Sequence, residues 1–559
     1  MDKVWLKAYE EGVPHTIEIP EKTLGQLLDE AVAERPNAAA VVFFGKRLPY
    51  RELGRLVDKF ATALTRLGVK KGDRVAIMMP NIPQYPVVHF GALKIGAILV
   101  PTNPLYVERE LQYQLNNSGA ETVVVLDFLY PKIERIRAET SLKNVIVTGV
   151  QEYLPWPVRW LYPLKARKEG NWYRVARRPG VHFLRDLLSE PFPTSVPEVD
   201  VRPEDTAIFL YTGGTTGVSK GAVLTHRNLV ANVHQIEAWF NRDRTVPEVF
   251  LCALPFFHSY GLTTGLHMSV VTKSTMVLIP NPRDIKTLLA AIQKNGVTIF
   301  AGVPTLYVAV NNFPKVSKFN LSSVKACVSG GAALPLEVAR TFENLTGGRL
   351  VEGYGLSETS PVTHTNPING LRKEGSIGVP LPNTDARVVD PETKEPVPVG
   401  EVGELAVKGP QVMQGYWQMP EETAQVLHDG WLFTGDMARM DEDGYFYIVD
   451  RKKEMIIAGG YNIFPREIEE VLYEHPAIVE AAVIGVPHEY RGETVKAFVV
   501  PKAGQNVTEA EVIAFCKEKL APYKVPKMVE FRDSLPKSNI GKILKRVLLE
   551  EELNKQTQA

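Results

Sequence analysis

The amino-acid sequence predicts an α/β protein with a large N-terminal domain and a small α+β C-terminal domain. Short apolar runs recur through the first 450 residues, helix-like segments separate many of them, and the pattern changes near residue 450. Strands that alternate with helices are typical of parallel sheets covered by helices. We therefore expect parallel-type sheets layered with helices, plus a β-subdomain, in residues 1–449. A mobile α+β domain is expected at 455–559, after a charged hinge at 450–454.

The expected elements of the large domain begin with a helix that ends at Gly68. Its apolar residues recur at helical spacing, at Leu53, Leu56, Val57, Phe60, Leu64 and Leu67. Apolar runs of strand length follow at 73–79, 122–126, 145–147, 207–210, 275–279, 297–301 and 326–328. These runs predict the strands of the parallel sheets.

The C-terminal region has a compact pattern of its own. Beyond the hinge we expect a helix from about Arg466, strands at 479–484 and 497–500, a helix at 509–520 and a strand near Val529. This length and order suit a small α+β domain.

Composition narrows the range of functions. The chain of 559 residues carries 64 Lys and Arg against 64 Asp and Glu, so no overall field favours nucleic acid. Cys252, Cys327 and Cys516 are widely spaced, which fits a reducing compartment and neither a disulfide scaffold nor a zinc site. The N-terminus lacks a signal-peptide core, and the richest apolar stretch is broken by His89 and Lys94. We expect a cytoplasmic protein that binds no nucleic acid.

Residues 153–180 differ from their surroundings because tryptophans and basic residues gather there. The tryptophans are Trp156, Trp160 and Trp172, and the charged residues are Arg159, Lys165, Arg167, Lys168, Arg174, Arg177 and Arg178 against Glu169 alone. A membrane interface attracts this combination, although an ordinary basic surface is the alternative. Pro155, Pro157 and Pro163 are expected to prevent one clean amphipathic helix. The interpretation allows peripheral contact with the inner face of the membrane through this segment.

A loop rich in glycine and threonine at 211–221 is the strongest functional signal. It follows an apolar run and contains Thr212, Gly213, Gly214, Thr215, Thr216, Gly217 and Lys220. Small residues let backbone N–H groups approach phosphate oxygens, hydroxyls add donors, and the lysine supplies positive charge. The spacing is not that of a Walker A loop. The alternative is a plain surface loop.

Four further stretches carry candidate site residues. The first is a glycine turn with Gly331 and Ala332, and the second is Glu-Gly-Tyr-Gly-Leu-Ser-Glu-Thr at 352–359, with Tyr354, Gly355, Glu358 and Thr359. In the third, Asp436 follows a glycine, and in the fourth, Lys542 follows a glycine. Glycines allow a flat ligand to approach the backbone, and Tyr354 offers a face for stacking. A carboxylate such as Glu358 suits Mg²⁺, and Lys542 can act as a point charge. Each stretch alone could be a turn, a helix cap or a solvated side chain.

Together these motifs resemble, in order, the adenylate-forming superfamily of acyl-CoA synthetases, firefly luciferase and peptide-synthetase adenylation domains. The resemblance runs from about residue 25 to 550 and rests on the phosphate loop and on 353–359, 434–436, 450–453, 459–465 and the Lys542 loop. One departure is Ser219, where many members carry proline. We expect this difference to alter loop stiffness and not chemistry.

The resemblance implies ATP, Mg²⁺ and coenzyme A as co-substrates or activator, and it implies a role for each site residue. Thr212 to Lys220 would hold the β- and γ-phosphates, Tyr354 adenine, and Asp436 and Arg451 the ribose. Glu358, with Thr212, would place Mg²⁺, and Thr359 would donate to phosphate. Lys542 would bridge the substrate carboxylate and the α-phosphate. Lys453 matches the hinge position, about which Gly459 and Gly460 would swing toward a pantetheine tunnel.

The acid substrate is less directly encoded. Residues 254–261 lack the carboxylate that amino-acid-activating relatives use. Candidates for an apolar pocket are Phe256, Phe257, His258, Tyr260, Val303, Thr305 and Leu306, and each could instead pack in the core. The region 128–195 resembles an insertion of bacterial long-chain fatty acid–CoA ligases, so we favour medium- to long-chain fatty acids. An aryl or coumarate-type acid is the alternative, followed by a catalytically silent acyl-nucleotide sensor or carrier. A homodimer is compatible with this interpretation.

Overall fold

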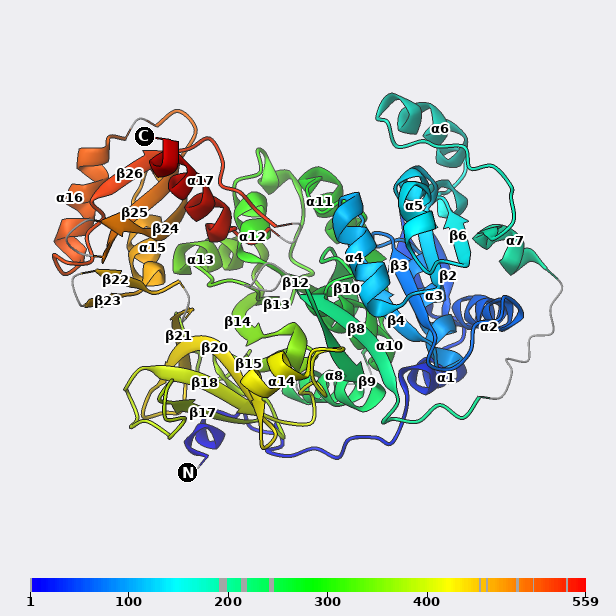
Figure 1. The fold of residues 1–559 in the computed structure, drawn as a ribbon, viewed down its shortest axis with the longest axis horizontal. Coiled ribbons are helices and arrows are strands. Elements are labelled where there is room, and N and C mark those ends of the chain that lie inside the picture. Colours follow the sequence, from blue (N-terminus) through cyan, green and yellow to red (C-terminus); the bar gives the residue numbers. More distant parts are fainter. Residues whose placement is uncertain are drawn as a thin grey trace.

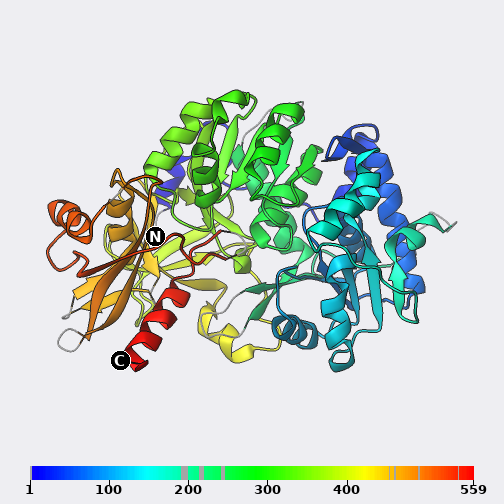
Figure 2. The ribbon, with the colours of Figure 1, turned by 90° about the horizontal axis from the view of Figure 1, so that it is seen from above.

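The computed structural model describes residues 3–190, 199–212, 219–240, 246–451, 454–458, 461–488, 492–505, 507–538 and 541–558, excepting the side chains at 451, 461, 462, 492 and 556–558. Two large sheets covered by helices lie next to each other, with a small β-subdomain and a separate C-terminal sheet (Figure 1). Figure 2 shows the part of the chain after residue 454, the C-terminal module, at one end of the molecule and the first large sheet at the other. This arrangement confirms the predicted fold class.

The first large sheet has seven strands in the order β7-β6-β5-β3-β4-β8-β9. These are β3 (Arg74–Met78), β4 (Ile98–Pro101), β5 (Thr122–Leu126), β6 (Asn144–Thr148), β7 (Val181–Phe183), β8 (Thr206–Thr212) and β9 (Lys220–Thr225). All neighbours are parallel except β8 and β9, which form an antiparallel hairpin. The two strands that flank the phosphate loop therefore form one edge of the sheet.

The second large sheet has nine strands in the order β16-β15-β14-β13-β12-β10-β11-β1-β2. These are β1 (Ala39–Phe43), β2 (Lys46–Pro49), β10 (Val249–Cys252), β11 (Thr275–Leu278), β12 (Ile299–Gly302), β13 (Ala326–Ser329), β14 (Arg349–Gly355), β15 (Val362–Thr365) and β16 (Val379–Pro380). The central strands from β14 to β1 are parallel. Their carboxyl ends share one edge, where ligands of such sheets bind.

Two smaller sheets complete the fold. The β-subdomain contains β17 (Asp385–Val389), β18 (Gly403–Lys408), β19 (Leu427–His428), β20 (Trp431–Met440) and β21 (Phe446–Arg451). The C-terminal sheet contains β22 (Ile456–Ala458), β23 (Tyr461–Ile463), β24 (Ile478–His488), β25 (Gly492–Pro501) and β26 (Met528–Phe531). Asp450 and Arg451, expected in the hinge, still pair with β20. The C-terminal sheet buries a separate core around Ile468, Val499 and Cys516.

Helices cover these sheets. They are α1 (Leu24–Glu34), α2 (Tyr50–Arg66), α3 (Gln84–Lys94), α4 (Glu108–Ser118), α5 (Tyr130–Ile136), α6 (Val158–Lys168), α7 (Leu184–Ser189), α8 (His226–Phe240), α9 (Ser259–Gly261), α10 (Met268–Val271), α11 (Ile285–Asn295), α12 (Pro304–Asn311), α13 (Leu336–Thr346), α14 (Pro420–Val426), α15 (Pro465–Tyr473), α16 (Glu509–Lys519) and α17 (Lys545–Gln558). Short helical turns are η1 (Val4–Ala8), η2 (Asp127–Leu129), η3 (Arg137–Glu139), η4 (Val150–Tyr153), η5 (Leu262–His267), η6 (Val316–Lys318) and η7 (Ser357–Thr359). The helix expected before Gly68 is α2, which buries the predicted apolar face.

Residues 153–180 contain one short helix despite their prolines. Helix α6 covers only part of the segment and runs through Pro163, so residues 153–180 do not form one continuous helix, as the prolines predicted. Pro155 and Pro157 precede the helix, where a missing N–H group is tolerated, and Pro163 removes only one helical hydrogen bond. The prolines therefore limit the helix to 158–168 and do not abolish it.

The apolar stretch that contains His89 and Lys94 belongs to the interior of the large domain. Helix α3 is buried from Gln84 to Leu93, and Lys94 at its end pairs with Asp29 and Asp58 at 2.5 and 2.6 Å. Within the described ranges, no helix combines the length and the apolar composition needed to cross a bilayer. The stretch is thus explained as a core helix and its following strand.

A buried histidine pair joins α3 to η5. The Nε2 atoms of His89 on α3 and His267 on η5 are 3.0 Å apart, and both side chains are almost completely buried. Burial, together with the neighbouring His267, holds the pKa of His89 well below its usual range. Burial likewise lowers the pKa of His267 to about 3. Both rings are therefore neutral in the folded protein at neutral pH.

We predict that acid destabilises the fold through this pair. Unfolded histidines take up protons below about pH 6.5, whereas the folded pair does not, so stability present above that pH is lost as the pH falls. His267→Gln removes one such group and keeps a polar partner for His89. Its melting temperature should fall less than that of the wild type between about pH 7.5 and about pH 5. The exposed control His428→Gln should follow the wild type, and an unchanged pH dependence of His267→Gln would contradict the account.

Candidate functional site

Two cavities meet at the carboxyl ends of the central strands in the second sheet. The first is apolar, and Trp239, Phe250, Met268, Ile299, Ala301 and Val328 are among the residues that line it. The second is polar and includes Glu352, Asp436, Asp450, Arg466, Lys542 and Lys545 in its wall. The two cavities share Val303, Gly331, Gly353, Tyr354 and Gly355. An apolar ligand in the first can therefore present its end group to a polar ligand in the second.

Glycines bring the backbone close to the junction. A Cβ atom at Gly355 would overlap the carbonyl oxygen of Pro361, so a side chain here would displace the backbone. Gly331 lies in the wall of both cavities, and Ala332 lies in that of the polar cavity. The predicted glycine-rich turns are thus brought together from the ends of β13 and β14.

Tyr354 and Asp436 are brought into direct contact from distant parts of the chain. The Tyr354 hydroxyl donates a hydrogen bond of 2.6 Å to Oδ2 of Asp436. Asp436 lies on β20, directly opposite Arg451 on β21, whose side chain lies outside the described part. The aromatic ring and the carboxylate predicted for a nucleoside therefore occupy one wall of the polar cavity.

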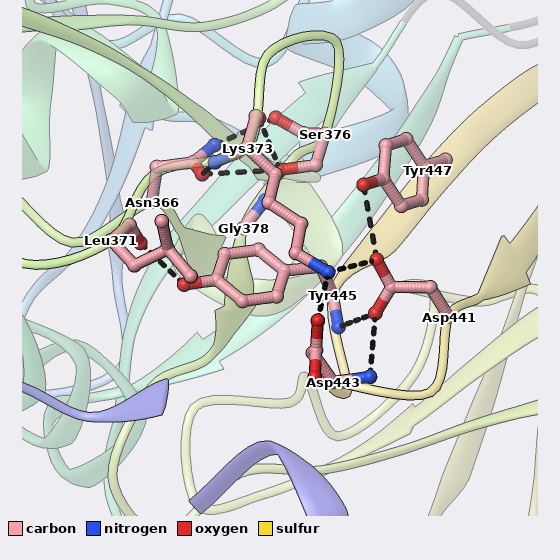
Figure 3. A network of polar contacts seen from close by, with 9 residues as sticks. All are labelled: Asn366, Leu371, Lys373, Ser376, Gly378, Asp441, Asp443, Tyr445 and Tyr447. Atoms are coloured by element: carbon pink, nitrogen blue, oxygen red, sulfur yellow. Dashed lines mark hydrogen bonds and ion pairs between the residues drawn. The ribbon is translucent and has the colours of Figure 1, made fainter. Parts of the chain in front are cut away.

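A polar network fixes the β20–β21 hairpin that carries Asp436 (Figure 3). Lys373 forms ion pairs with Asp441 and Asp443 at 2.7 and 2.5 Å, and its ammonium group lies 4.9 Å from the ring centroid of Tyr445. The backbone N–H of Phe446 donates to the carbonyl of Gly378 at 3.0 Å. The hairpin is thereby joined to the loop between β15 and β16, which sets the position of Asp436 against Tyr354.

The phosphate loop is described at its two ends. Thr212 pairs with Lys220 across the β8–β9 hairpin, and the Ser219 hydroxyl donates to the carbonyl of Thr212 at 2.8 Å. Tyr113 on α4 donates to the carbonyl of Ser219 at 3.0 Å. A proline at position 219 could not make the side-chain bond. The predicted residues Gly213, Gly214, Thr215, Thr216 and Gly217 lie outside the described residues, as do Lys453, Gly459 and Gly460.

Tyr416 is a site residue that sequence reasoning missed. Its hydroxyl donates to Oε1 of Glu358 at 2.8 Å, and the Lys220 ammonium lies 5.3 Å from its ring centroid. Burial, with the neighbouring Glu358, raises the pKa of Tyr416, so its hydroxyl stays protonated as a donor. Tyr416 thus links the lysine of the phosphate loop to the predicted metal ligand. The glycine and two aromatic residues at 415–417 are the signal that could have drawn attention to it.

Thr359 is completely buried beside Glu358. Its hydroxyl is 3.0 Å from the carbonyl oxygen of Leu356 and 2.5 Å from that of Pro361. The Leu356 N–H in turn donates to this hydroxyl at 3.1 Å. These contacts shape the turn at η7 that holds Glu358 toward Tyr416, and a phosphate would have to compete with them for the Thr359 hydroxyl.

The Lys542 loop reaches from the C-terminal module into the large domain. Gly541 has a positive φ of 80°, and a Cβ atom there would overlap Oγ1 of Thr305 on α12. The Lys542 N–H donates to the Ser538 hydroxyl at 3.1 Å, and the Ser538 N–H donates to the Lys542 carbonyl at 2.7 Å. Lys542 is therefore held in the wall of the polar cavity.

His258 faces Lys542 from the apolar cavity. Burial and the positive charge of Lys542 lower the pKa of His258 to about 4, so the imidazole is neutral at neutral pH. Val303 lines both cavities, and Thr305 lines the polar one. Phe257 lines neither of these two cavities. It lies in the turn between Phe256, which is buried in the core, and His258, which lines the apolar cavity. For Phe256 the core alternative holds, since it is fully buried against Tyr85.

Glu352 and Arg466 form a second feature that the sequence did not indicate. Arg466 on α15 donates to the carbonyl of Ile448 at 2.8 Å and lies 3.7 Å from Oε1 of Glu352. Its backbone N–H also donates to Asp450 at 3.1 Å. Burial raises the pKa of Glu352 to about 7, although Arg466 acts in the opposite direction. These contacts join the C-terminal module to the edge of the large domain beside the polar cavity.

Comparisons with known proteins agree with this geometry. The family model described as "AMP-binding enzyme" matches residues 28–417, and "AMP-binding enzyme C-terminal domain" matches residues 467–542. A long-chain-fatty-acid–CoA ligase of Bacillus subtilis (strain 168) is 48% identical over 553 residues, covering 98% of each chain. One from Escherichia coli O6:H1 is 42% identical over 555 residues, covering 99% of this chain and 98% of that one.

A solved structure extends the agreement to the backbone. The anthranilate CoA ligase AuaEII, in complex with anthranoyl-AMP, has a TM-score of 0.87 at 26% identity and covers 97% of this chain and 99% of its own. The superfamily resemblance drawn from the motifs is thus confirmed. Because both family models match and the identity extends along the whole chain, the chain belongs to the AMP-binding family of adenylate-forming enzymes.

Proposed function

We infer that this chain is an ATP-dependent, AMP-forming long-chain fatty acid–CoA ligase. Relatives with this name match it over its full length, at 48% and 42% identity. The observation that carries the proposal is the junction of an apolar cavity and a polar cavity at Tyr354 and Gly355, with Lys542 in the polar wall. This arrangement suits an acid with an apolar body and a nucleotide whose phosphates meet its carboxylate.

In the first half-reaction, a carboxylate oxygen of the acid forms a bond to the α-phosphorus of ATP. The bond from that phosphorus to the bridging oxygen breaks, and pyrophosphate leaves with its electron pair. Lys542 supplies positive charge where the two anions meet, which stabilises the charge that develops in the transition state. Because His258 is neutral, it adds no second positive charge at the mouth of the apolar cavity.

The nucleotide would be bound by residues of the polar cavity and by the phosphate loop. Tyr354 and Asp436 would bind the adenosine part, with Arg451 as a further ribose contact, and Thr212 to Lys220 would bind the phosphates. Glu358 and Thr212 fit a magnesium site, because Mg²⁺ takes one or two protein oxygens together with substrate phosphates. When bound, Mg²⁺ neutralises phosphate charge. Tyr416 orients the Glu358 carboxylate through its hydrogen bond.

In the second half-reaction, the sulfur of CoA attacks the carbonyl carbon of the acyl-adenylate. The carbon–oxygen bond to AMP breaks, AMP departs, and the thiol proton passes to solvent. Residues 455–559 would turn about 450–454, withdrawing Lys542 and bringing Gly459 and Gly460 to the site. Two features support this motion: the module has its own core, and polar contacts of Arg466 join it to Ile448 and Asp450.

The lining of the apolar cavity suits an acid whose body is uncharged. Among the described residues that line it, none carries a carboxylate, a guanidinium or an ammonium group. The site therefore offers no counter-charge for a substrate ammonium. We also propose a cytoplasmic location, because Cys252, Cys327 and Cys516 are free thiols buried at separate places in the fold.

Loss of the cation should separate the two half-reactions. We predict that Lys542→Ala lowers the rate of adenylate formation about 10²–10³-fold, because one charge-stabilising group at a reacting centre commonly contributes that much. Thioester formation from supplied acyl-adenylate should change far less. Pyrophosphate release and CoA thioester formation measure the two steps. Lys527→Ala, an exposed lysine of the same module, is the matched control, and equal losses in both steps would refute the two-conformation scheme.

The Tyr416 hydroxyl should matter for the metal-dependent step. Tyr416→Phe keeps the ring beside Lys220 but removes the donor to Glu358, so we expect about a tenfold rise in the Mg²⁺ concentration needed for half-maximal adenylation, as for partners of metal ligands in general. Magnesium titrations of pyrophosphate release measure this. Tyr130→Phe, which removes a hydroxyl bonded to Glu134 on α5, is the control. An unaltered magnesium requirement would exclude the proposed role of Tyr416.

Bulk added inside the apolar cavity should change the choice of acid. Ala301→Phe fills space in the wall of β12, so turnover of palmitate should fall about tenfold more than turnover of hexanoate, a difference of about 1.4 kcal/mol that overpacking readily supplies. A panel of fatty acids, benzoate and coumarate, assayed by pyrophosphate release, measures this preference. Ala291→Phe on α11 is the control for added volume. A wild type that prefers aryl acids would support the alternative ligase. If none of the acids causes pyrophosphate release, the catalytically silent sensor would be supported instead.

A further inference from the structure

Helix α6 stands at the outer corner of the first sheet (Figure 1), and none of its residues lines either of the two cavities. Large apolar side chains are exposed on it and just before it: Trp156, Trp160, Leu161 and Leu164. Trp160 is 74% exposed and Leu164 is 66% exposed. Apolar side chains of this size gathered on a protein surface commonly mark an interaction site.

The outward orientation of these side chains is fixed by the opposite face of the helix. Ala166 is buried, and Tyr162 is sufficiently enclosed that burial raises the pKa of its hydroxyl to about 12. Positions 162 and 166 are one turn apart and anchor α6 to the domain. Positions 160, 161 and 164 form a stripe on a different face of the helix. The stripe is therefore exposed even though the opposite face of α6 is packed against the domain.

Basic side chains surround the apolar stripe. Arg159, Arg167 and Lys168 are exposed, and within the described part of the chain they form no ion pair with a carboxylate. Arg167 also lies over the ring of Trp172, at 5.3 Å from its centroid. Lys165 forms an ion pair with Glu169 at 3.7 Å. This local positive charge stands out in a chain whose formal net charge is zero.

We propose that α6 docks on the surface of an anionic lipid bilayer. Trp160, Leu161 and Leu164 enter the boundary between headgroups and acyl chains, and the surrounding arginines and lysine bind lipid phosphates. The helix has 11 residues, too few to cross a bilayer, so it lies along the surface. Charge complementarity favours a lipid surface over a second copy of the chain, because two copies of this basic face would repel each other.

Docking through α6 would place the enzyme where fatty acids are concentrated, a consequence that rests on the proposed function. Long acyl chains partition into bilayers, so an enzyme held at the surface meets more substrate than one in solution. The docking itself needs no catalytic residue, because α6 is remote from Lys542 and from the cavities. It can therefore succeed or fail independently of the proposed reaction.

Vesicle binding tests the proposal. Intact wild-type protein should co-sediment with phosphatidylcholine vesicles that contain phosphatidylglycerol, and far less with phosphatidylcholine alone. The apolar variant Trp160→Ser/Leu164→Ser should lose at least about tenfold in partitioning. The charge variant Arg159→Gln/Arg167→Gln/Lys168→Gln should lose about a hundredfold on anionic vesicles, because each basic side chain near such a surface contributes roughly fivefold. Added salt should release the wild type.

Matched controls decide what any loss means. Leu371→Ser/Val399→Ser removes two exposed apolar side chains elsewhere and should bind as the wild type does. Unchanged melting temperatures and unchanged turnover of octanoate without vesicles would show that the variants are folded and active. Equal vesicle binding by wild type and both α6 variants, or none by the wild type, would overturn the proposal. So would a change of oligomeric state in the α6 variants without a change in vesicle binding.

Discussion

The close contact between Gly541 and Thr305 sets where Lys542, the proposed catalytic cation, lies. A side chain at 541 would overlap the Thr305 hydroxyl and would be strained at the positive φ of this residue. Glycine therefore lets the loop settle on α12 and carry Lys542 into the wall of the polar cavity. The module behind this loop has a hydrophobic core of its own. The proposed motion would therefore not require the module to unfold, because polar contacts such as those of Arg466 can be exchanged for contacts with water.

The electrostatic environment of Lys542 follows from where its neighbours are buried. The apolar cavity keeps His258 neutral, and the acidic groups Glu352, Asp436 and Asp450 lie in the polar cavity instead. In the proposed reaction, a carboxylate at the end of an apolar chain would therefore meet a cation across the junction. Among the described residues that line the apolar cavity, it would meet no fixed anion. Because the charged groups lie on one side only, one cavity has an apolar lining and the other a polar lining, although they share the wall at Tyr354 and Gly355.

Sequence reasoning located the strands, the helices and the glycine turns well, because each depends on a short stretch of chain. The apolar run at 122–126 is β5, and the spacing before Gly68 is α2. Glycine patterns marked the turns at Gly331, Gly355 and Gly541, where backbone approach leaves no room for a side chain or requires a positive φ. The acid pocket was harder, because in 256–258 one aromatic residue enters the core, the next enters neither cavity and the histidine faces the site.

What the sequence could not supply is the pairing of residues that lie far apart along the chain. Tyr416 reaches Glu358 across 58 positions and Tyr354 reaches Asp436 across 82, and no local periodicity encodes either contact. Each depends on how the β-subdomain is joined to the second sheet, through contacts such as those of Lys373. Motif residues are thus chosen by local chemistry, whereas their orientation is set by the residues that hold the sheets together. The motif residues alone therefore do not fix the geometry of this site, because Glu358 and Asp436 are oriented by Tyr416 and by the hairpin anchored at Lys373.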